Sequence, residues 1–564
     1  MAPAADIDLF APFEKDTILE VRTSRMKTMS GLTIQTGIDK ELRSGKIPVT
    51  YLGLDADEHD LTFHGGRDKA IHGYCSSHYR QWIQEFPDAE ARFKPGGFGE
   101  NFVTARMNER NVCIGDILSV GDDGVLLQVS LPRQPCFKLN HRFQLKNFAP
   151  NTYKTSRTGW YYRVLREGTV QAGDEIRLVE RKWPKWTIER VQEYLHRTPD
   201  NHDMNEELSQ VVDMGDESRK AFETRAAKFK AKQKREAGGE DKEAENWRDY
   251  KLVEKKAQTP RILSFILEAV TPNPDAGEKD LKLGSHVRLK LPNGLLRSYS
   301  IVSGNENRFE LGVALEENSR GGSTYLHQNA REGDVMQVGR ITSDVKPAAA
   351  ASNHVFIVGG IGITAFLSLI EVYRRINWET TLHYGVRSSD EVPFRERLDG
   401  LKHLVKIYDG SRGQRMDIGD IFRKLTWNSH VYVCGPRGML EEAAREAKRC
   451  GLGEDDVHFE AFSADTTGDP FEAEVANREG KVVEVANREG KVVEVGGEET
   501  LLEVLRRYFD DVPSSCEVGN CGTCRVVLKS GKVGHRGTAL TEEEKKEAML
   551  SCVSRGSGRI VIEI

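Results

Sequence analysis

The stretch Cys516-Glu517-Val518-Gly519-Asn520-Cys521-Gly522-Thr523-Cys524, followed by Cys552, carries the most specific pattern in the sequence. Its spacing is C-x4-C-x2-C with a distant fourth cysteine, which is the ligand spacing of plant-type [2Fe–2S] clusters. Gly519 and Gly522 let the loop turn tightly and direct backbone N–H groups at the sulfurs. A zinc site is the alternative, but structural zinc favours paired CxxC units. The predicted cluster ligands are Cys516, Cys521, Cys524 and Cys552.

Length, composition and charge exclude several classes of protein. At roughly 150 residues per domain, the 564 residues suggest three or four domains. The net charge of −6, from 81 Lys and Arg against 87 Asp and Glu, is too mild for a nucleic-acid-binding chain. The apolar run 355–369 is interrupted by glycines and suits a buried strand and turn better than a membrane span. Because the start of the chain lacks the pattern of a secretion or transit signal, we expect a cytoplasmic protein without nucleic-acid or membrane partners.

A highly charged segment divides the chain. More than half of residues 222–257 are charged and lack the apolar spacing of a packed core, which predicts a solvated helix and then a linker. A ten-residue sequence occurs at 474–483 and again at 484–493; it suits a duplicated hairpin or long loop and carries no predicted chemistry. The predicted units are a β-rich domain at 20–182, a small helical extension at 183–232, a linker at 233–258, a β-barrel at 259–345, a parallel α/β domain at 346–462 and a strand-rich domain at 463–564.

Two motifs in the predicted barrel indicate a flavin site. Arg297-Ser298-Tyr299-Ser300 follows a strand-like run, and Arg320-Gly321-Gly322-Ser323 comes shortly after it. A flavin needs an aromatic ring against the isoalloxazine, a hydroxyl near its reactive nitrogen, and a cation with backbone amides for its phosphate. The predicted contributions are the ring of Tyr299, the hydroxyl of Ser300, the cation of Arg297, and the amides and hydroxyl of Gly322 and Ser323.

The α/β domain begins with a glycine turn that is typical of dinucleotide binding. The apolar strand Val355–Val358 leads into Gly359-Gly360-Ile361-Gly362-Ile363-Thr364, and a helix-like run follows. Glycines at such a junction let a pyrophosphate approach the start of a helix. A second strand of the same sheet ends at Cys434-Gly435-Pro436, and ligands of open α/β folds bind at such strand ends. Arg387-Ser388 suits either a 2′-phosphate or the adenosine diphosphate, so NADH and NADPH both stay open.

Residues 259–564 resemble phthalate dioxygenase reductase and its relatives, in which a flavin barrel, a nicotinamide domain and a C-terminal ferredoxin follow one another. The resemblance implies FMN rather than FAD as the flavin. Ala365 stands where that family usually has proline, and we expect the difference to affect only the rigidity of the helix start. The residues that match the family are Arg297, Tyr299, Ser300, Gly321, Gly322 and Ser323 for FMN, and Gly359, Gly360, Gly362, Thr364, Cys434, Gly435 and Pro436 for the nicotinamide nucleotide.

Cys136 is the candidate reactive residue of the N-terminal domain. It lies in Leu131-Pro132-Arg133-Gln134-Pro135-Cys136-Phe137-Lys138, at the end of a strand-like run. Arg133 and Lys138 favour the thiolate, which makes Cys136 a candidate nucleophile or soft-metal ligand. A buried structural cysteine is the alternative.

Residues 20–232 resemble the MOSC domain, a fold named for molybdenum-cofactor sulfurases, in the branch with a helical extension. The motifs are His64-Gly65-Gly66-Arg67, Gly99-Glu100-Asn101-Phe102, the Cys136 segment, Gly159–Leu165 and Trp183–Ile188. The resemblance implies that Cys136 is a sulfur carrier or molybdenum ligand, that Arg133 acts beside it, and that His64 and Asn101 line a pocket. The expected fold is therefore multidomain: a β-rich MOSC barrel with a helical appendage, a flavin-binding β-barrel, an α/β nicotinamide-binding domain and a plant-type ferredoxin of the β-grasp type.

These parts together suggest an electron-transfer chain. A hydride brings two electrons and a [2Fe–2S] cluster carries one, so a flavin must separate the pair. The leading hypothesis passes electrons from NAD(P)H through FMN and the cluster to a molybdenum cofactor at Cys136, which reduces an N-hydroxylated or N-oxide small molecule. The rival hypothesis gives the electrons to a separate oxygenase, with the MOSC domain as a docking module. A third is sulfur transfer through a Cys136 persulfide.

Overall fold

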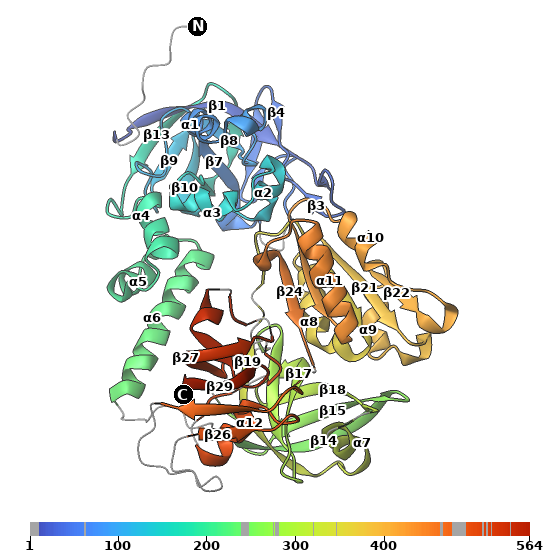
Figure 1. Cartoon of the computed structure of the whole chain (residues 1–564). Coiled ribbons are helices and arrows are strands. Elements are labelled where there is room, and N and C mark those ends of the chain that lie inside the picture. The colour runs from blue at the N-terminus through green and yellow to red at the C-terminus, as the bar shows by residue number, and fades with distance from the viewer. Residues whose placement is uncertain are drawn as a thin grey trace.

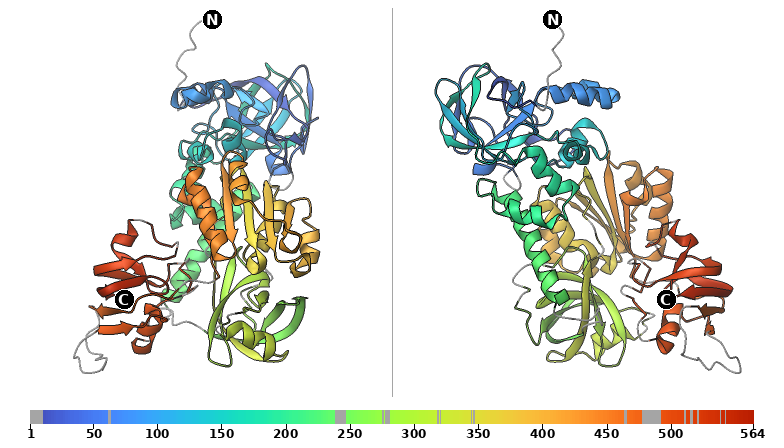
Figure 2. Two further views of the ribbon diagram at one scale, coloured as in Figure 1. Left: turned by 45° about the vertical axis from the view of Figure 1, so that its right-hand side comes forward. Right: turned by 90° about the vertical axis from the view of Figure 1, so that its left-hand side faces the viewer.

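The computed structural model describes residues 11–60, 64–237, 247–274, 276, 281–317, 319, 321–343, 345, 347–462, 466–476, 492–509, 512–514, 517–519, 522–537, 539–541 and 543–564. Four structural units are visible in Figure 1, and they confirm the predicted fold class. The nicotinamide domain lies between the N-terminal domain and the flavin barrel, and the C-terminal domain lies beside the barrel (Figures 1 and 2). No helix among the described residues is both long and apolar enough to cross a membrane.

The N-terminal domain is a curved eight-stranded sheet. Its first strand along the chain, β1, also pairs with its last, β13, so that the sheet closes on itself. Its order is β13-β9-β10-β11-β7-β8-β1-β4. Alternating apolar residues such as Ile18, Leu118 and Val129 fill the inside of the barrel. The strands are β1 (Lys15–Thr23), β2 (Lys27–Thr28), β3 (Gln35–Thr36), β4 (Glu41–Arg43), β5 (Ile47–Thr50), β6 (Gly53–Leu54), β7 (Ile71–Cys75), β8 (Phe102–Thr104), β9 (Ile117–Val120), β10 (Val125–Pro132), β11 (Trp160–Arg166), β12 (Gly168–Val170) and β13 (Glu175–Glu180).

Helices cover the ends of this barrel. Ile188, Val191 and Leu195, whose spacing predicts a helix, are buried against the barrel core. The long helix α6 extends from this appendage toward the flavin barrel (Figure 1). The helices are α1 (Ser77–Glu85), α2 (Phe137–Phe143), α3 (Phe148–Lys154), α4 (Ile188–Gln192), a π-helical turn (Glu193–Arg197), α5 (His202–Ser209) and α6 (Asp216–Ala237).

The flavin barrel begins earlier than the sequence predicts. Helix α6 ends at Ala237 and β14 starts at Arg248. The predicted linker, 233–258, therefore overlaps the end of the helix and most of the strand. Tyr250 and Leu252 of β14 point into the barrel core, whereas its charged residues face outward; the charge of this outer face hides the strand from a composition argument. The closed barrel, in the order β14-β15-β18-β17-β16-β19, consists of β14 (Arg248–Thr259), β15 (Ile262–Ala269), β16 (Ser285–Lys290), β17 (Leu296–Asn305), β18 (Arg308–Ala314) and β19 (Val335–Ser343), with α7 (Gly322–Gln328).

The nicotinamide domain is a five-stranded parallel sheet in the order β22-β21-β20-β23-β24. The strand order reverses between β20 and β23, and this switch point is where open α/β sheets bind ligands. Strand β20 is buried along its whole length, which accounts for its continuous apolar sequence. The elements are β20 (Asn353–Gly359), α8 (Ile363–Arg375), β21 (Thr380–Val386), α9 (Arg395–Asp399), β22 (Val405–Asp409), α10 (Ile418–Arg423), β23 (Ser429–Cys434), α11 (Arg437–Arg449) and β24 (Val457–Glu460).

The C-terminal domain is a mixed five-stranded sheet in the order β26-β25-β29-β27-β28 with one helix packed on it. The parallel pair β25–β29 lies at its centre, as in a β-grasp fold. The ten-residue repeat spans the connection between β25 and β26, which pair antiparallel; residues 477–491 of it lie outside the described residues. The elements are β25 (Phe471–Val475), β26 (Val492–Val495), α12 (Leu501–Tyr508), β27 (Arg525–Gly534), β28 (Ala548–Leu550) and β29 (Arg555–Glu563).

Candidate functional sites

The two predicted flavin motifs come together on one side of the barrel. Arg297, Tyr299 and Ser300 lie on β17, and Gly322 and Ser323 form the first turn of α7. A Cβ atom on Gly322 would lie 2.7 Å from Cγ of Arg297, so the arginine side chain lies directly against this turn. A guanidinium beside the first turn of a helix suits a flavin phosphate. Arg320 lies outside the described residues.

Tyr299 lies on the same strand as Arg297, two residues further along. It lies opposite Val287 of β16 and contacts the apolar core. Burial raises the pKa of Tyr299 to about 12, so the phenol stays neutral at physiological pH. A neutral ring at this position suits stacking on an isoalloxazine, which is the role predicted for it.

The glycine turn and the Cys434 loop meet at the switch point of the nicotinamide sheet. A Cβ atom on Gly362 would lie only 2.4 Å from the carbonyl oxygen of Cys434, and one on Gly359 would lie 2.7 Å from Cδ of Pro436. No other residue fits at these two positions without moving backbone or ring atoms. Thr364, the second residue of α8, donates a hydrogen bond to the Ile361 carbonyl at 2.9 Å. A glycine turn before a helix suits a pyrophosphate, which is the role predicted for it.

The two described cluster cysteines lie next to each other inside the C-terminal domain. The sulfur atoms of Cys524 and Cys552 are 3.0 Å apart, and both residues are buried. Gly519 and Gly522 adopt left-handed backbone conformations, with φ of 83° and 75°, as the tight loop requires. Cys516 and Cys521 lie outside the described residues, so their part in the site stays a prediction.

The cluster loop is docked on the flavin barrel through Arg288. This arginine, on β16, donates a hydrogen bond to the Ser514 carbonyl at 3.3 Å and lies 3.6 Å from the Glu517 carboxylate. In the sheet, Arg288 pairs with Ser298, the neighbour of Arg297 and Tyr299. The contact therefore holds the cluster loop against β16, the neighbour of the strand that carries the flavin motif.

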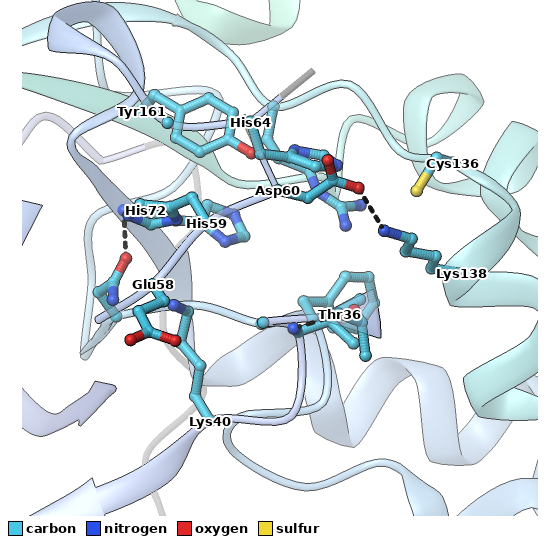
Figure 3. A pocket seen from close by; sticks show the side chains of 17 residues that line it. Thr36, Lys40, Glu58, His59, Asp60, His64, His72, Cys136, Lys138 and Tyr161 are labelled. Atoms are coloured by element: carbon cyan, nitrogen blue, oxygen red, sulfur yellow. Dashed lines mark hydrogen bonds and ion pairs between the residues drawn. The ribbon is translucent and has the colours of Figure 1, made fainter. Parts of the chain in front are cut away.

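A cavity in the N-terminal domain gathers the residues predicted there. His64, Asn101, Arg133 and Cys136 all line it, and Lys138 extends along its rim (Figure 3). The space between these residues, counted together with its open mouth, is about 550 Å³. Cys136 is partly exposed and immediately precedes α2, while Arg133 follows the last residue of β10.

Buried donors without partners make this cavity suitable for an anion. Nη1 of Arg133 and Nε2 of His72 have no hydrogen-bond partner among the described residues, and Arg133 is only 3% exposed. Leaving such groups unsatisfied is costly, so a ligand that accepts hydrogen bonds is expected here. Burial, reinforced by the cations of Lys138 and Arg133, lowers the pKa of His64 to about 3. Burial raises the pKa of Tyr161 to about 12, so its hydroxyl remains a donor.

Sequence reasoning missed part of this cavity. Asn101, placed there by resemblance, also supports the wall: its side-chain amide donates to Asp57 at 2.8 Å, and its carbonyl accepts the His72 N–H at 3.0 Å. Lys40 forms a buried ion pair with the same Asp57. The sequence does contain a signal for these residues: 57–60 are all acidic or histidine, and they come shortly before the glycine turn at His64. The cavity residues not predicted are Thr36, Gly37, Ile38, Lys40, Glu58, His59, Asp60, His72, Phe98 and Tyr161.

Comparisons with known proteins agree with this division. Residues 60–177 match the MOSC domain family, and residues 484–556 match the 2Fe-2S iron-sulfur cluster binding domain. A reductase of Gibberella moniliformis is 36% identical over 574 positions, covering 97% of this chain and 95% of that protein. The carnitine monooxygenase reductase subunit of Escherichia coli is 33% identical and covers 56% of this chain and 99% of that protein. The solved structure of phthalate dioxygenase reductase is 29% identical, with a TM-score of 0.44, and covers 57% of this chain and 98% of that one.

The chain therefore belongs to the family of the Gibberella moniliformis reductase, and it is an NAD(P)H-dependent iron–sulfur flavoprotein oxidoreductase fused to a MOSC domain.

Proposed function

We propose that this chain delivers electrons from NAD(P)H, through FMN and its [2Fe–2S] cluster, to a molybdenum cofactor in the MOSC cavity, and so reduces N-hydroxylated or N-oxide compounds. The observation that carries the proposal is the cavity itself, where Cys136 lies beside buried donors that lack partners. A chain that already contains a complete reductase gives such a cavity a source of electrons.

The residues of the cavity fit a molybdenum cofactor. This cofactor is an anionic, phosphate-bearing pterin, and a thiolate is a soft ligand that suits its metal. In our proposal Cys136 holds the metal, while Arg133 and Lys138 bind the anionic groups. Burial lowers the pKa of His72 well below the ordinary value, so its ring adds no charge to the cavity.

The electron count supports a two-electron reduction as the last step of electron transfer. Reduction of a hydroxylamine consumes two electrons and two protons: NAD(P)H + H⁺ + R–NHOH gives NAD(P)⁺ + R–NH₂ + H₂O. When bound, the metal centre supplies the chemistry that collects electrons arriving singly from the cluster. Tyr161, with its raised pKa, keeps a hydroxyl proton available for hydrogen bonding to the leaving oxygen.

Metal analysis of the whole chain tests this proposal. Protein made in a host that synthesises molybdenum cofactor should contain molybdenum and pterin in amounts close to its flavin. Cys136→Ala should lose most of the molybdenum while it keeps flavin and iron. The matched control is Cys450→Ala, because Cys450 is an exposed cysteine and does not line the cavity. Normal molybdenum in Cys136→Ala, or none in the wild-type protein, would remove the assignment.

A second function is favoured by one observation. Relatives such as the Escherichia coli carnitine monooxygenase reductase subunit are named as parts of oxygenase systems and match the reductase part of this chain. In this alternative the chain reduces a separate oxygenase, and the MOSC domain is a docking module. Turnover of a hydroxylamine or amidoxime by the purified chain alone, without added protein, favours the first function over the second.

A further inference from the structure

The outer corner of the nicotinamide sheet is rich in arginine. Strands β21 and β22 are neighbours in the sheet, and Val386, the last residue of β21, pairs with Asp409, the last residue of β22. Arg387 follows the first of these strands, and the turn Gly410–Arg412 follows the second. The Ser411 N–H donates to the Arg387 carbonyl at 2.8 Å. Arg387 and Arg412 therefore belong to two chain segments that are hydrogen-bonded to each other.

This corner is where the adenosine end of a dinucleotide meets an open α/β sheet. The pyrophosphate lies at the glycine turn after β20, and the adenosine ribose then reaches the end of the adjacent strand, here β21. A carboxylate at that strand end accepts hydrogen bonds from the ribose hydroxyls of NADH, whereas an arginine there accommodates the 2′-phosphate of NADPH. The side chain that comes first after β21 is the guanidinium of Arg387.

The carboxylate at the end of the neighbouring strand, Asp409, already accepts several hydrogen bonds. Asp409 accepts hydrogen bonds from the Ser389 N–H at 3.0 Å, from the Ser411 N–H at 2.9 Å and from the Ser411 hydroxyl at 2.6 Å. Its side chain is only 6% exposed. These bonds, led by the one from Ser411, lower the pKa of Asp409 to about 2. Asp409 therefore holds the two turns together and is not available to a ribose hydroxyl. The next carboxylates, Asp390 and Glu391, lie one turn further along the chain.

The two guanidinium groups, in contrast, are exposed. The side chains of Arg387 and Arg412 are 64% and 71% exposed, and Nε of Arg412 lies 3.5 Å from the Asp409 carboxylate. Arg387 lies 2.9 Å from Glu317 of the flavin barrel, a carboxylate that is itself 71% exposed and also pairs with Arg261. A surface ion pair of this kind is weak, and a dianionic phosphate that binds a guanidinium through two oxygens is a stronger partner.

We infer that the chain prefers NADPH to NADH, with Arg387 and Arg412 binding the 2′-phosphate of the nucleotide. Ser388 is placed to assist, because its hydroxyl accepts the Asp390 N–H at 3.3 Å and a hydroxyl that accepts one hydrogen bond can still donate its proton. Glu317 competes with the phosphate for Arg387 and moves away when the nucleotide binds. This preference concerns the reductase half alone and is independent of what the MOSC cavity holds.

Steady-state kinetics and ligand binding test the inference on the full chain. With ferricyanide as acceptor, kcat/KM should be about 10- to 100-fold higher for NADPH than for NADH, as expected for charge-assisted hydrogen bonds to the phosphate. Calorimetry should show that 2′,5′-ADP binds more tightly than 5′-ADP by a similar factor. Equal or weaker binding of 2′,5′-ADP, together with a preference for NADH, would overturn the inference. Tight binding of both compounds would assign Arg387 to the pyrophosphate and would equally overturn it.

Single substitutions test which residues set the preference for NADPH over NADH. Arg387→Ala and Arg412→Ala should each lower the ratio of kcat/KM for NADPH over NADH about tenfold. Glu317→Gln should tighten the binding of 2′,5′-ADP, because it removes the competing carboxylate. The matched control is Arg374→Ala at the other end of α8, where the guanidinium donates to the Gly400 carbonyl at 2.7 Å; its ratio should equal that of the wild-type chain. If Arg374→Ala changed the ratio as much as Arg387→Ala, the phosphate site would not lie at this corner.

Discussion

The side-chain amide of Asn377, in the nicotinamide domain, donates a hydrogen bond to the carboxylate of Asp60, in the MOSC domain, at 2.7 Å. Asp60 also pairs with Lys138 at 3.1 Å, on the rim of the cavity that holds Cys136. Glu379, two residues after Asn377, accepts the Thr33 N–H at 2.7 Å. The reductase half therefore supports the mouth of the MOSC cavity and is not merely tethered to it.

Loss of the Asn377 contact should loosen this junction. Asn377→Ala removes a donor from a nearly buried carboxylate, which costs about 1–2 kcal/mol. We expect faster hydrogen exchange at residues 29–36, the segment that contacts the nicotinamide domain, with no change in NAD(P)H–ferricyanide activity. Unchanged exchange at these residues would show that the other contacts alone hold the two domains together.

The MOSC domain should lose stability in mild acid through His64. Burial holds the pKa of His64 at about 3, compared with 6.5 in a model peptide, so between these values the unfolded chain binds a proton that the folded chain does not. The free energy of unfolding therefore falls as the pH drops below about 6.5 and is unaffected by this group above it. At pH 5 the loss is about 1–2 kcal/mol. His64→Gln should reduce the difference between urea midpoints measured at pH 7 and pH 5; an identical difference in both proteins would contradict this account.

A methyl group at Gly362 should damage the nucleotide site. Gly362→Ala places a Cβ atom against the Cys434 carbonyl, so either the turn or the neighbouring loop must move. We expect the rate of flavin bleaching by NAD(P)H, followed by stopped flow, to fall by at least tenfold, which corresponds to roughly 1.4 kcal/mol. Gly438→Ala is the matched control, because a Cβ atom there meets nothing within 4 Å and its bleaching rate should match that of the wild type.

Cysteine replacement should separate the flavin from the cluster. Cys524→Ser or Cys552→Ser should abolish bound iron and acid-labile sulfide and stop the reduction of cytochrome c, while ferricyanide, which accepts electrons directly from a flavin, is still reduced. Cys450→Ser should keep its full iron content. An intact cluster in either of the first two variants would mean that the ligand set is different.

Local patterns in the sequence were sufficient for much of the fold. The strand, glycine turn and helix from Val355 to Ile370 lie where their apolar spacing predicts them, because buried parallel strands and phosphate-binding turns impose strong local constraints. Strand β14 was missed because its outer face is charged, so that the composition of Arg248–Thr259 is that of a linker.

The MOSC cavity and its junction with the reductase needed the folded chain. Asp60 and Lys138 are distant in sequence, and Asn377 comes from another domain, yet the three side chains form one network at the cavity that Cys136 lines. No local pattern marks Asn377, because an asparagine after a helix is common in any fold. Contacts of this kind depend on how whole domains pack, and the periodicity of a single segment does not encode that packing.

The central claim is that electrons from the nucleotide leave the chain at Cys136, and anaerobic stopped flow tests it most directly. The molybdenum-loaded chain is first titrated with NADPH until flavin and cluster are both bleached, which takes more than one two-electron equivalent, and is then mixed with an amidoxime. The account predicts that the wild-type chromophores reoxidise and that the chromophores of Cys136→Ala stay reduced. Reoxidation at the same rate in both proteins, or in neither, would contradict it.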